Sequence, residues 1–164
     1  MQPNQVITLF DYHWDTTERL LENAAQLDAN TYHAHSEYGA GSIHKLFFHL
    51  IAANHGWRIG LVEGRQQPGL SVDDYPDRSA LEALLKLERA AWREYLSQLS
   101  KYNLASEVTI TTLRGHERSF PLWRVLIHLI LHGMQHHSEL AQALSSHGLS
   151  PGNIDFIFYS REGS

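Results

Sequence analysis

The segment HLILHGMQHHSEL, residues 128–140, places four histidines among leucines and isoleucines. His128, His132 and His136 follow one another at intervals of four, so in a helix they lie one turn above each other. Two neutral imidazoles in this arrangement can share one divalent metal ion. With 12 histidines in 164 residues, roughly one such pair is expected by chance, so the spacing alone does not establish a site.

The position of these histidines around the helix is more informative than their spacing. At about 100° per residue, one apolar face contains Leu122, Val125, Leu126, Leu129, Gly133, Leu140, Ala143 and Leu144. His136 lies near the centre of this face and His132 within its flank. His128 lies near the border, and His137 on the far flank. A buried imidazole needs partners for both nitrogens, and a metal ion supplies one of them, so His132 and His136 are predicted ligands.

A third ligand is expected from another helix. His49 is the leading candidate, because it lies beside the apolar face of the helix predicted around FFHLIAANHGW. His55 lies about 120° further round that helix and cannot easily face the same point. His13, inside the apolar face of the first predicted helix, is the alternative. Hydrogen-bonded core histidines, or a histidine-rich interface, are the alternatives to a metal site.

The remaining aromatic side chains are interpreted as structural. The tryptophans Trp14, Trp57, Trp92 and Trp123 are predicted core anchors. Surface or structural positions are predicted for His33, His35, His44, His55, His116 and His147.

The composition restricts the chemistry further. The chain has no cysteine, so its metal ligands must be imidazoles or carboxylates. A net charge of -5 and 13 scattered lysines and arginines argue against a nucleic-acid partner. No secretory signal and no uncharged stretch long enough to span a bilayer are present, so we expect a cytoplasmic protein without membrane contact. Motifs of other enzyme classes, such as GxSxG, HExxH or a phosphate-binding glycine loop, are absent from the sequence.

Four helices are predicted to position these side chains. Apolar residues recur at helical spacing in residues about 5–28, 42–63, 78–102 and 122–146. Ser42 and either Asp77 or Ser79 are predicted N-caps, and Gly64 is predicted to end the second helix. Solvated positions on the third helix are predicted for Glu82, Lys86, Glu88, Arg89, Arg93 and Glu94.

The segments between the helices have their own signals. QQPGLSVDDYPDRS, residues 66–79, is predicted to be a loop. The alternation in EVTITTLRGHERSF, with a turn at Arg114 and Gly115, predicts a short β-hairpin. Pro121 is placed to start the last helix and Gly148 to follow its end. PGNIDFIFYSRE is predicted to form a closing segment, for which a short helix is one option. We therefore expect one all-α domain, residues 1–164: a four-helix bundle with a short hairpin before the last long helix.

The order of these motifs resembles a known family. SIHKLFFHLIAANHGW, a long charged helix, a hairpin and then PLWRVLIHLILHGMQHHSELAQALSSHGLSPGNIDFIFY are similar to the DinB/YfiT-like metalloenzymes over nearly the whole chain. The resemblance implies a four-helix bundle, often a homodimer, in which three histidines bind one divalent ion, commonly zinc or nickel. The matching positions are His49, His132 and His136.

The same resemblance implies a class of reaction. Family members with an assigned activity are metal-dependent S-transferases or isomerases that use low-molecular-weight thiols such as bacillithiol, mycothiol or glutathione. Two positions depart from the family pattern: His136 is followed by His137 and Ser138 in place of Arg-Gly, and Asn54 stands where an acid is common. The triad remains intact, whereas the thiol and the substrate are not specified.

The leading hypothesis is a metal-dependent thiol S-transferase. Its partners would be a small-molecule electrophile and a thiol co-substrate, with His128 and Glu139 near the ligands as orienting or acid-base groups. A metal-binding stress-response protein without turnover, or a metal-dependent hydrolase that uses the same histidines, are the alternatives.

Overall fold

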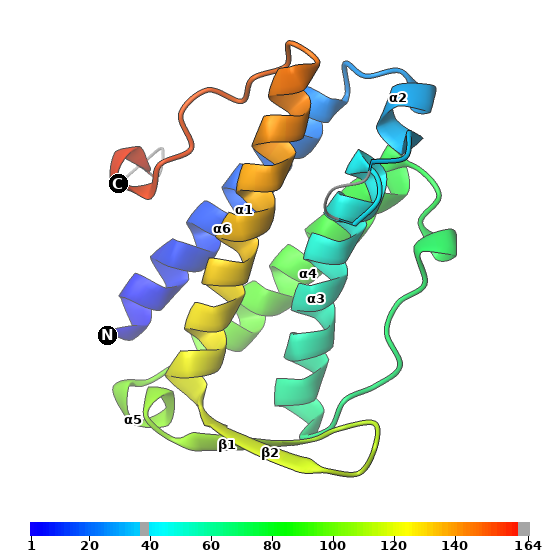
Figure 1. Cartoon of the computed structure of the whole chain (residues 1–164). Helices are drawn as coiled ribbons and strands as arrows, with labels where there is room; N and C mark the ends of the chain where they lie inside the picture. Colours follow the sequence, from blue (N-terminus) through cyan, green and yellow to red (C-terminus); the bar gives the residue numbers. More distant parts are fainter. Residues whose placement is uncertain (37–39, 161–164) are drawn as a thin grey trace.

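Four long helices form the body of the molecule (Figure 1). The computed structural model describes residues 1–36 and 40–160. The long helices in this part of the chain are α1 (Pro3–Ala24), α3 (Ile43–Glu63), α4 (Arg78–Ser97) and α6 (Leu122–Ser146). Both α1 and α3 pack against α4 and α6, so the four helices close around one core. The predicted four-helix bundle is confirmed.

The connections determine the direction of each helix. The short helix α2 (Ala29–His33) lies between α1 and α3 at one end of the bundle. After α3 the chain runs back along the whole bundle, through the 3-10 turn η1 (Val72–Asp74), before α4 begins. As Figure 1 shows, α3 and α4 therefore run in the same direction, whereas α6 runs opposite to α3.

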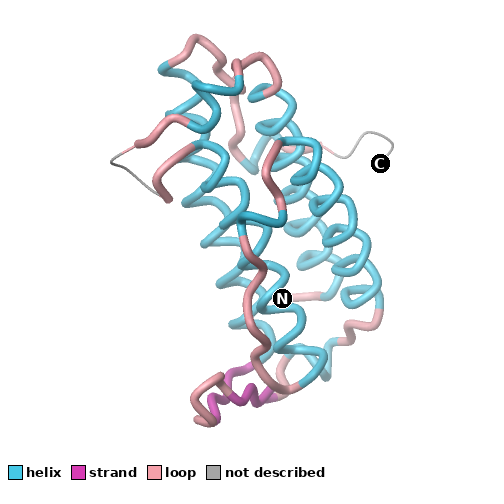
Figure 2. The backbone as a smooth tube through the Cα atoms, turned by 90° about the vertical axis from the view of Figure 1, so that its right-hand side faces the viewer, coloured by secondary structure: helices cyan, strands magenta, loops and turns pink. Residues whose placement is uncertain are grey.

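A two-stranded hairpin closes the other end of the bundle, where α3 ends (Figures 1 and 2). The short helix α5 (Lys101–Leu104) leads into β1 (Glu107–Thr111), which pairs antiparallel with β2 (Glu117–Pro121). Gly115 in the turn has φ +79°, a left-handed conformation that glycine adopts without strain. The hairpin prediction is confirmed.

The predicted caps at the helix ends are observed. Ser42 Oγ accepts a hydrogen bond from the backbone N–H of Lys45 at 3.1 Å and so caps α3. Asp77, and not Ser79, caps α4, because its carboxylate accepts from the N–H of Ala80 at 2.9 Å. Gly64, with φ +70°, ends α3.

Two helices end earlier than predicted. α1 ends at Ala24, before residue 28, because Asp28 caps the separate helix α2. α4 ends at Ser97, because Ser100 and Asn103 form a capping box that starts α5 as a new helix. Apolar periodicity continues across such breaks, so it locates the helices better than their ends.

The core joins α1 to α4 through aromatic packing. The rings of Phe10 and Trp92 lie with their centroids 4.9 Å apart, and both residues are buried. Trp14 is buried as predicted and Trp57 is half-buried. The prediction for Trp123 is wrong: it is 45% exposed, because it lies about 100° round α6 from the buried Leu122.

Glu88 on α4 is a second correction, since it was predicted to be solvated. It is only 3% exposed and faces α3, where Arg58 Nη2 lies 2.8 Å and His55 Nδ1 2.7 Å from its carboxylate. Burial raises the pKa of Glu88, but the hydrogen bonds from Arg58 and His55 outweigh burial and lower it. A buried carboxylate is therefore stabilised by paired donors from the neighbouring helix.

The closing segment lies along α1. It contains the 3-10 turn η2 (Phe156–Phe158), and the hydroxyl of Tyr12 donates to the carbonyl of Ile154. The end of the predicted segment, residues 161 and 162, lies outside the described residues. Within the described part of the chain, no helix combines the length and the apolar character that crossing a bilayer requires.

Candidate metal centre

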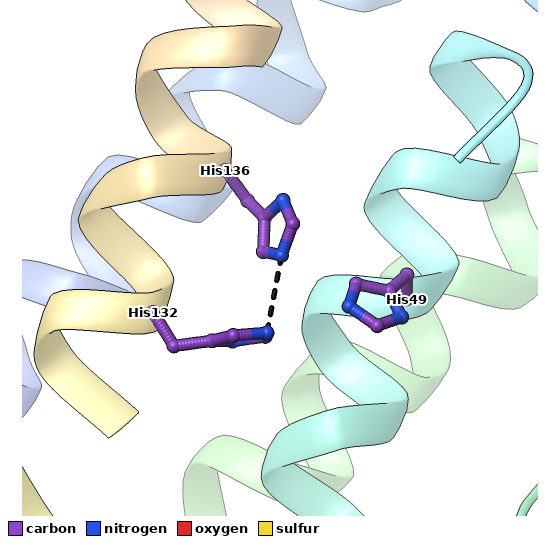
Figure 3. Close-up of side chains that lie close together, drawn as sticks. All are labelled: His49, His132 and His136. Atoms are coloured by element: carbon purple, nitrogen blue, oxygen red, sulfur yellow. Dashed lines mark hydrogen bonds between the residues drawn. The ribbon is translucent and has the colours of Figure 1, made fainter. Parts of the chain in front are cut away.

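Three histidines from two antiparallel helices point toward one another (Figure 3). His49 extends from α3, and His132 and His136 extend from successive turns of α6. One ring nitrogen of each residue lies within 4.8 Å of the other two. The structure thus brings together the three side chains that the sequence singled out, and they are called the triad below.

The packing of α6 on α3 positions the triad. Leu129 and Leu140 anchor α6 in the core on either side of the two histidines, and Leu50 does the same for α3 beside His49. All three leucines are essentially inaccessible to solvent. Because these anchors fix both helices, the imidazoles face each other without further support from loops.

The separations within the triad fit a single ion. Nitrogens that share a tetrahedral zinc ion, each at roughly 2.0–2.1 Å from it, lie about 3.4 Å apart. Nε2 of His132 and Nε2 of His136 are 3.1 Å apart. The ring centroids of His49 and His136 are 4.8 Å apart, and the exposed His49 has room to adjust its rotamer. The donor set, three imidazoles, suits zinc, nickel or copper.

The environment favours neutral imidazoles, which are the form that binds metals. Burial and the neighbouring rings of His136 and His49 lower the pKa of His132 to about 4. Partial burial and the nearby His136 also lower the pKa of His49. Both rings are therefore unprotonated near neutral pH and keep a lone pair for an ion.

Glu139 orients one ring of the triad. Its carboxylate Oε2 lies 2.8 Å from Nδ1 of His136, three residues earlier on α6. A carboxylate accepts the Nδ1 proton, so Nε2 of His136 keeps its lone pair directed at His132 and His49. Burial raises the pKa of Glu139, but the hydrogen bonds from His136 and Gln135, together with the nearby rings of His136 and His49, outweigh burial, so the net shift is downward. The glutamate thus stays ionised and fixes the tautomer of His136.

A second, buried histidine group lies next to the triad and does not join it. This inner group consists of His13 and Thr17 on α1, Asn54 on α3 and His137 on α6. Asn54 Nδ2 lies 3.3 Å from Nε2 of His13, and Thr17 Oγ1 lies 2.8 Å from Nε2 of His137. His13 is 1% exposed and His137 is fully buried, although the sequence placed His137 on the far flank of the apolar face.

His13 was the alternative third ligand, and it lies outside the cluster of potential ligands. Among the described residues, the cluster of potential ligands contains His49 and not His13. Nε2 of His13 is instead engaged by Asn54, the residue that replaces the family's usual acid. Burial, and to a lesser extent His132, lower the pKa of His13 to about 3. Thr17 was visible in the sequence only as a polar residue four positions after His13 within an apolar pattern.

The other histidines take mixed positions. His128 is exposed and its ring lies 5.5 Å from that of Trp57 and 5.9 Å from that of His132. His44 is buried, with its ring 4.5 Å from that of His33, and His55 pairs with Glu88. As predicted, His55 does not face the triad.

The comparisons with known proteins agree with this arrangement. The geometry defines a four-helix bundle with three converging histidines in its body. The model of the DinB family matches residues 1–163, and the chain belongs to the DinB family. No curated protein matches the sequence.

A solved structure shows the same fold. YfiT from Bacillus subtilis superposes with a TM-score of 0.67 over 90% of each chain, at 13% sequence identity. YfiT is described as a probable metal-dependent hydrolase with an unusual four-helix bundle topology. At this identity the likeness concerns the fold.

Proposed function

We propose that this chain binds one divalent ion, zinc or nickel, through His49, His132 and His136, and uses it to transfer a low-molecular-weight thiol onto a small electrophile. The observation that carries the proposal is the convergence of three imidazoles, with one of them on the exposed side of the cluster. Three protein ligands leave a coordination position for a reactant, as is typical of catalytic and not of closed structural sites.

The chain's own residues have distinct roles in this proposal. When bound, the ion supplies Lewis acidity and lowers the pKa of a thiol or water that it holds. The half-buried His132 and the buried His136 form the inner wall of the site, and Glu139 holds His136 in the required tautomer. His49 is exposed, so reactants reach the triad from its side. His128, one turn before His132, lies beside this approach.

The transfer itself is a substitution. The thiolate sulfur forms a bond to the electrophilic carbon, the leaving group departs with its electron pair, and the thiol proton goes to solvent. No redox partner is required. The family resemblance supports the thiol as the co-substrate.

A hydrolase is the second candidate, because the fold is shared with YfiT and the same triad would serve. In that case water and not a thiol is the nucleophile. The third candidate, a metal-binding stress-response protein without turnover, predicts that the ion holds the bundle together. The apolar core between all four helices supports a fold that survives chelation.

Metal analysis of untagged protein is the first experiment. We expect about one zinc or nickel ion per chain in the wild type. His49→Ala, His132→Ala and His136→Ala should each lose it, whereas His128→Ala, on the same helix and outside the triad, should retain it. A folded wild type that takes up neither zinc nor nickel on reconstitution would overturn the proposal.

Activity assays then separate the candidates. Metal-loaded protein with chloro-dinitrobenzene should consume the electrophile only when a thiol is present, and the triad variants should not. Ester hydrolysis that needs metal but no thiol would favour the hydrolase. Metal binding with neither reaction, together with unfolding on chelation, would favour the structural role.

A further inference from the structure

A cavity of about 480 Å³ opens between the hairpin and the end of α3. This is the lower end of the bundle in Figure 1. Its walls come from α3, from the segment that follows it, and from both sides of the hairpin turn. The volume lies within the roughly 300–1,000 Å³ typical of small-molecule sites. The triad does not line it, so it is a separate feature of the same face of α3.

Two glycines form the floor of the cavity. Gly56 and Gly60 lie one turn apart on α3, and both line it. A Cβ at Gly56 would have no atom within 4 Å, so the missing side chain leaves open space. A Cβ at Gly60 would already contact Ile110 of β1 at 3.4 Å. The first glycine thus creates room, and the second lets the hairpin approach α3.

One face of the hairpin supplies the opposite wall. Ile110 pairs with Arg118 across the hairpin, and Phe120 follows two residues later on the same side of β2. The ring of Phe120 lies 6.4 Å from that of Trp57 on α3, at an angle of 68°. These two aromatic rings give the cavity an apolar, aromatic interior.

Pairing of the backbone holds the hairpin against the end of α3. The N–H of Gln66 donates to the carbonyl of Thr111 at 2.8 Å, and the N–H of Thr111 donates to the carbonyl of Gly64 at 2.9 Å. The side chain of Gln66 also accepts from the N–H of Leu113 at 3.3 Å. One wall of the cavity is therefore held by hydrogen-bonded backbone and is not formed by a free loop.

Arg118 is the one charged side chain among the lining residues. It is exposed, and no described carboxylate forms an ion pair with it. Gln67 and Thr112 add polar groups near the same wall. An apolar interior with one unpaired guanidinium matches a flat hydrophobic molecule that carries an anionic group.

The cavity and the triad share a stripe of α3. Ala53, which also lines the cavity, lies one turn after His49, and Gly56 and Gly60 continue along the same side. On the facing helix, the ring of His128 lies between those of Trp57 and His132, at 5.5 and 5.9 Å. A ligand in the cavity therefore has its nearer end about one helical turn from His49.

We propose that this cavity binds the body of the substrate, and that the substrate is an aromatic or other flat apolar molecule with a carboxylate or similar anionic group held by Arg118. The reacting end of the substrate would lie at the triad, and this part of the inference rests on the proposed function. The occupancy of the cavity itself does not depend on a metal ion.

Binding of naphthoate and of its neutral analogue naphthamide, measured by calorimetry on chelated protein, tests the proposal. Chelation removes direct carboxylate–metal contacts from the measurement. We expect one naphthoate per chain, bound about threefold to tenfold more tightly than naphthamide, because a charge-assisted contact at an exposed guanidinium is modest. Arg118→Gln should remove this preference for the anion and leave naphthamide binding unchanged.

Substitutions at Gly56 provide the steric test and its control. Gly56→Leu fills the open space and should weaken both ligands by tenfold or more. Gly56→Ala adds one methyl group and should retain binding. Failure of the wild type to bind either ligand, equal affinity for both, or unchanged binding in Gly56→Leu would each overturn the proposal.

The metal content of the same proteins separates this proposal from the function on which it rests. All Gly56 and Arg118 variants should keep the wild-type metal content. If the wild type binds naphthoate in the cavity but takes up no metal, the proposed enzyme fails and the binding site remains. If it binds metal but not naphthoate, the proposed binding site fails and the proposed enzyme remains.

Discussion

The triad and the inner group are neighbouring sets of histidines that differ in their exposure to solvent and in their partners. His136 and His137 are neighbours in sequence, but at about 100° per residue their rings leave α6 on different sides. His136 joins an arrangement whose third member, His49, is exposed. His137 is sealed between α1 and α6, with its ring 5.0 Å from that of His13.

The partners of the two groups differ as much as their exposure. In the triad the ring nitrogens face one another, and Nδ1 of His136 is held by a carboxylate. In the inner group each histidine has one neutral partner, Asn54 or Thr17, and Nδ1 of both rings is buried without a hydrogen bond among the described residues. The first arrangement suits an ion, and burial keeps the rings of the second neutral. Substitutions in the two groups should therefore affect different properties.

Glu139→Gln should have the largest effect, and this effect should be limited to metal binding. An amide can no longer stabilise the Nδ1–H of His136 as a carboxylate does, so we expect metal affinity to fall roughly tenfold to a hundredfold. Competition with a chromophoric chelator measures this loss. Gln135→Ala, which removes a side chain that contacts Glu139 at 3.2 Å but keeps the carboxylate, is the control and should stay near wild type. Equal affinities for Glu139→Gln and wild type would show that Glu139 does not support the ligand.

Gly133→Ala should affect the inner group and change the stability of the fold. A Cβ at Gly133 would lie 2.4 Å from Nδ1 of the buried His13, so the ring or the helix must shift. Overpacking of this kind costs about 1–3 kcal/mol, against about 1 kcal/mol gained in helix propensity. Urea unfolding of chelated protein measures the net loss.

Gly56→Ala is the matched control for this substitution. It makes the same change inside a helix where a Cβ meets nothing within 4 Å, so it should stabilise the protein by about 0.5–1 kcal/mol. If Gly133→Ala proved as stable as Gly56→Ala, the close contact between α6 and His13 would not exist in solution.

The periodicity of the sequence was sufficient to predict the bundle, the hairpin and the side of α6 that carries His132 and His136. These features depend on local spacing, which a single chain displays directly. Which of His49 and His13 completes the triad depends on the rotation and distance of α3 and α1 relative to α6, and spacing within one helix does not contain that information. The place of His49 beside the apolar face of its helix made it the leading candidate, the resemblance to the DinB family favoured it as well, and the geometry brings it to the triad.

The buried polar pairs could not be predicted from the sequence for the same reason. Glu88 looked solvated because its neighbours on α4 are charged, yet its partners Arg58 and His55 come from α3. The cavity beside Trp57 likewise arises only when the hairpin folds back onto α3. Each of these features needs two segments that are distant in sequence and meet only in the folded chain.

The remaining prediction concerns the pH dependence of stability. The pKa of His13 falls to about 3 in the folded protein, from about 6.5 in an unfolded chain, because the ring is buried. Between these values the unfolded chain binds a proton that the folded protein does not. Protonation of His13 in the unfolded chain therefore lowers the free energy of unfolding as the pH falls from about 6.5 toward 3. The slope from one such group is about 1.4 kcal/mol per pH unit at most.

Urea unfolding between pH 6.5 and 4.5, with chelator present, tests this difference between the two histidine groups. His13→Gln should have a shallower slope than wild type by on the order of 1 kcal/mol per pH unit, whatever its absolute stability. His116→Gln removes an exposed ring on the hairpin and should keep the wild-type slope. If His13→Gln also kept that slope, His13 would be open to protonation in the folded state, and the inner group would be as accessible as the triad beside it.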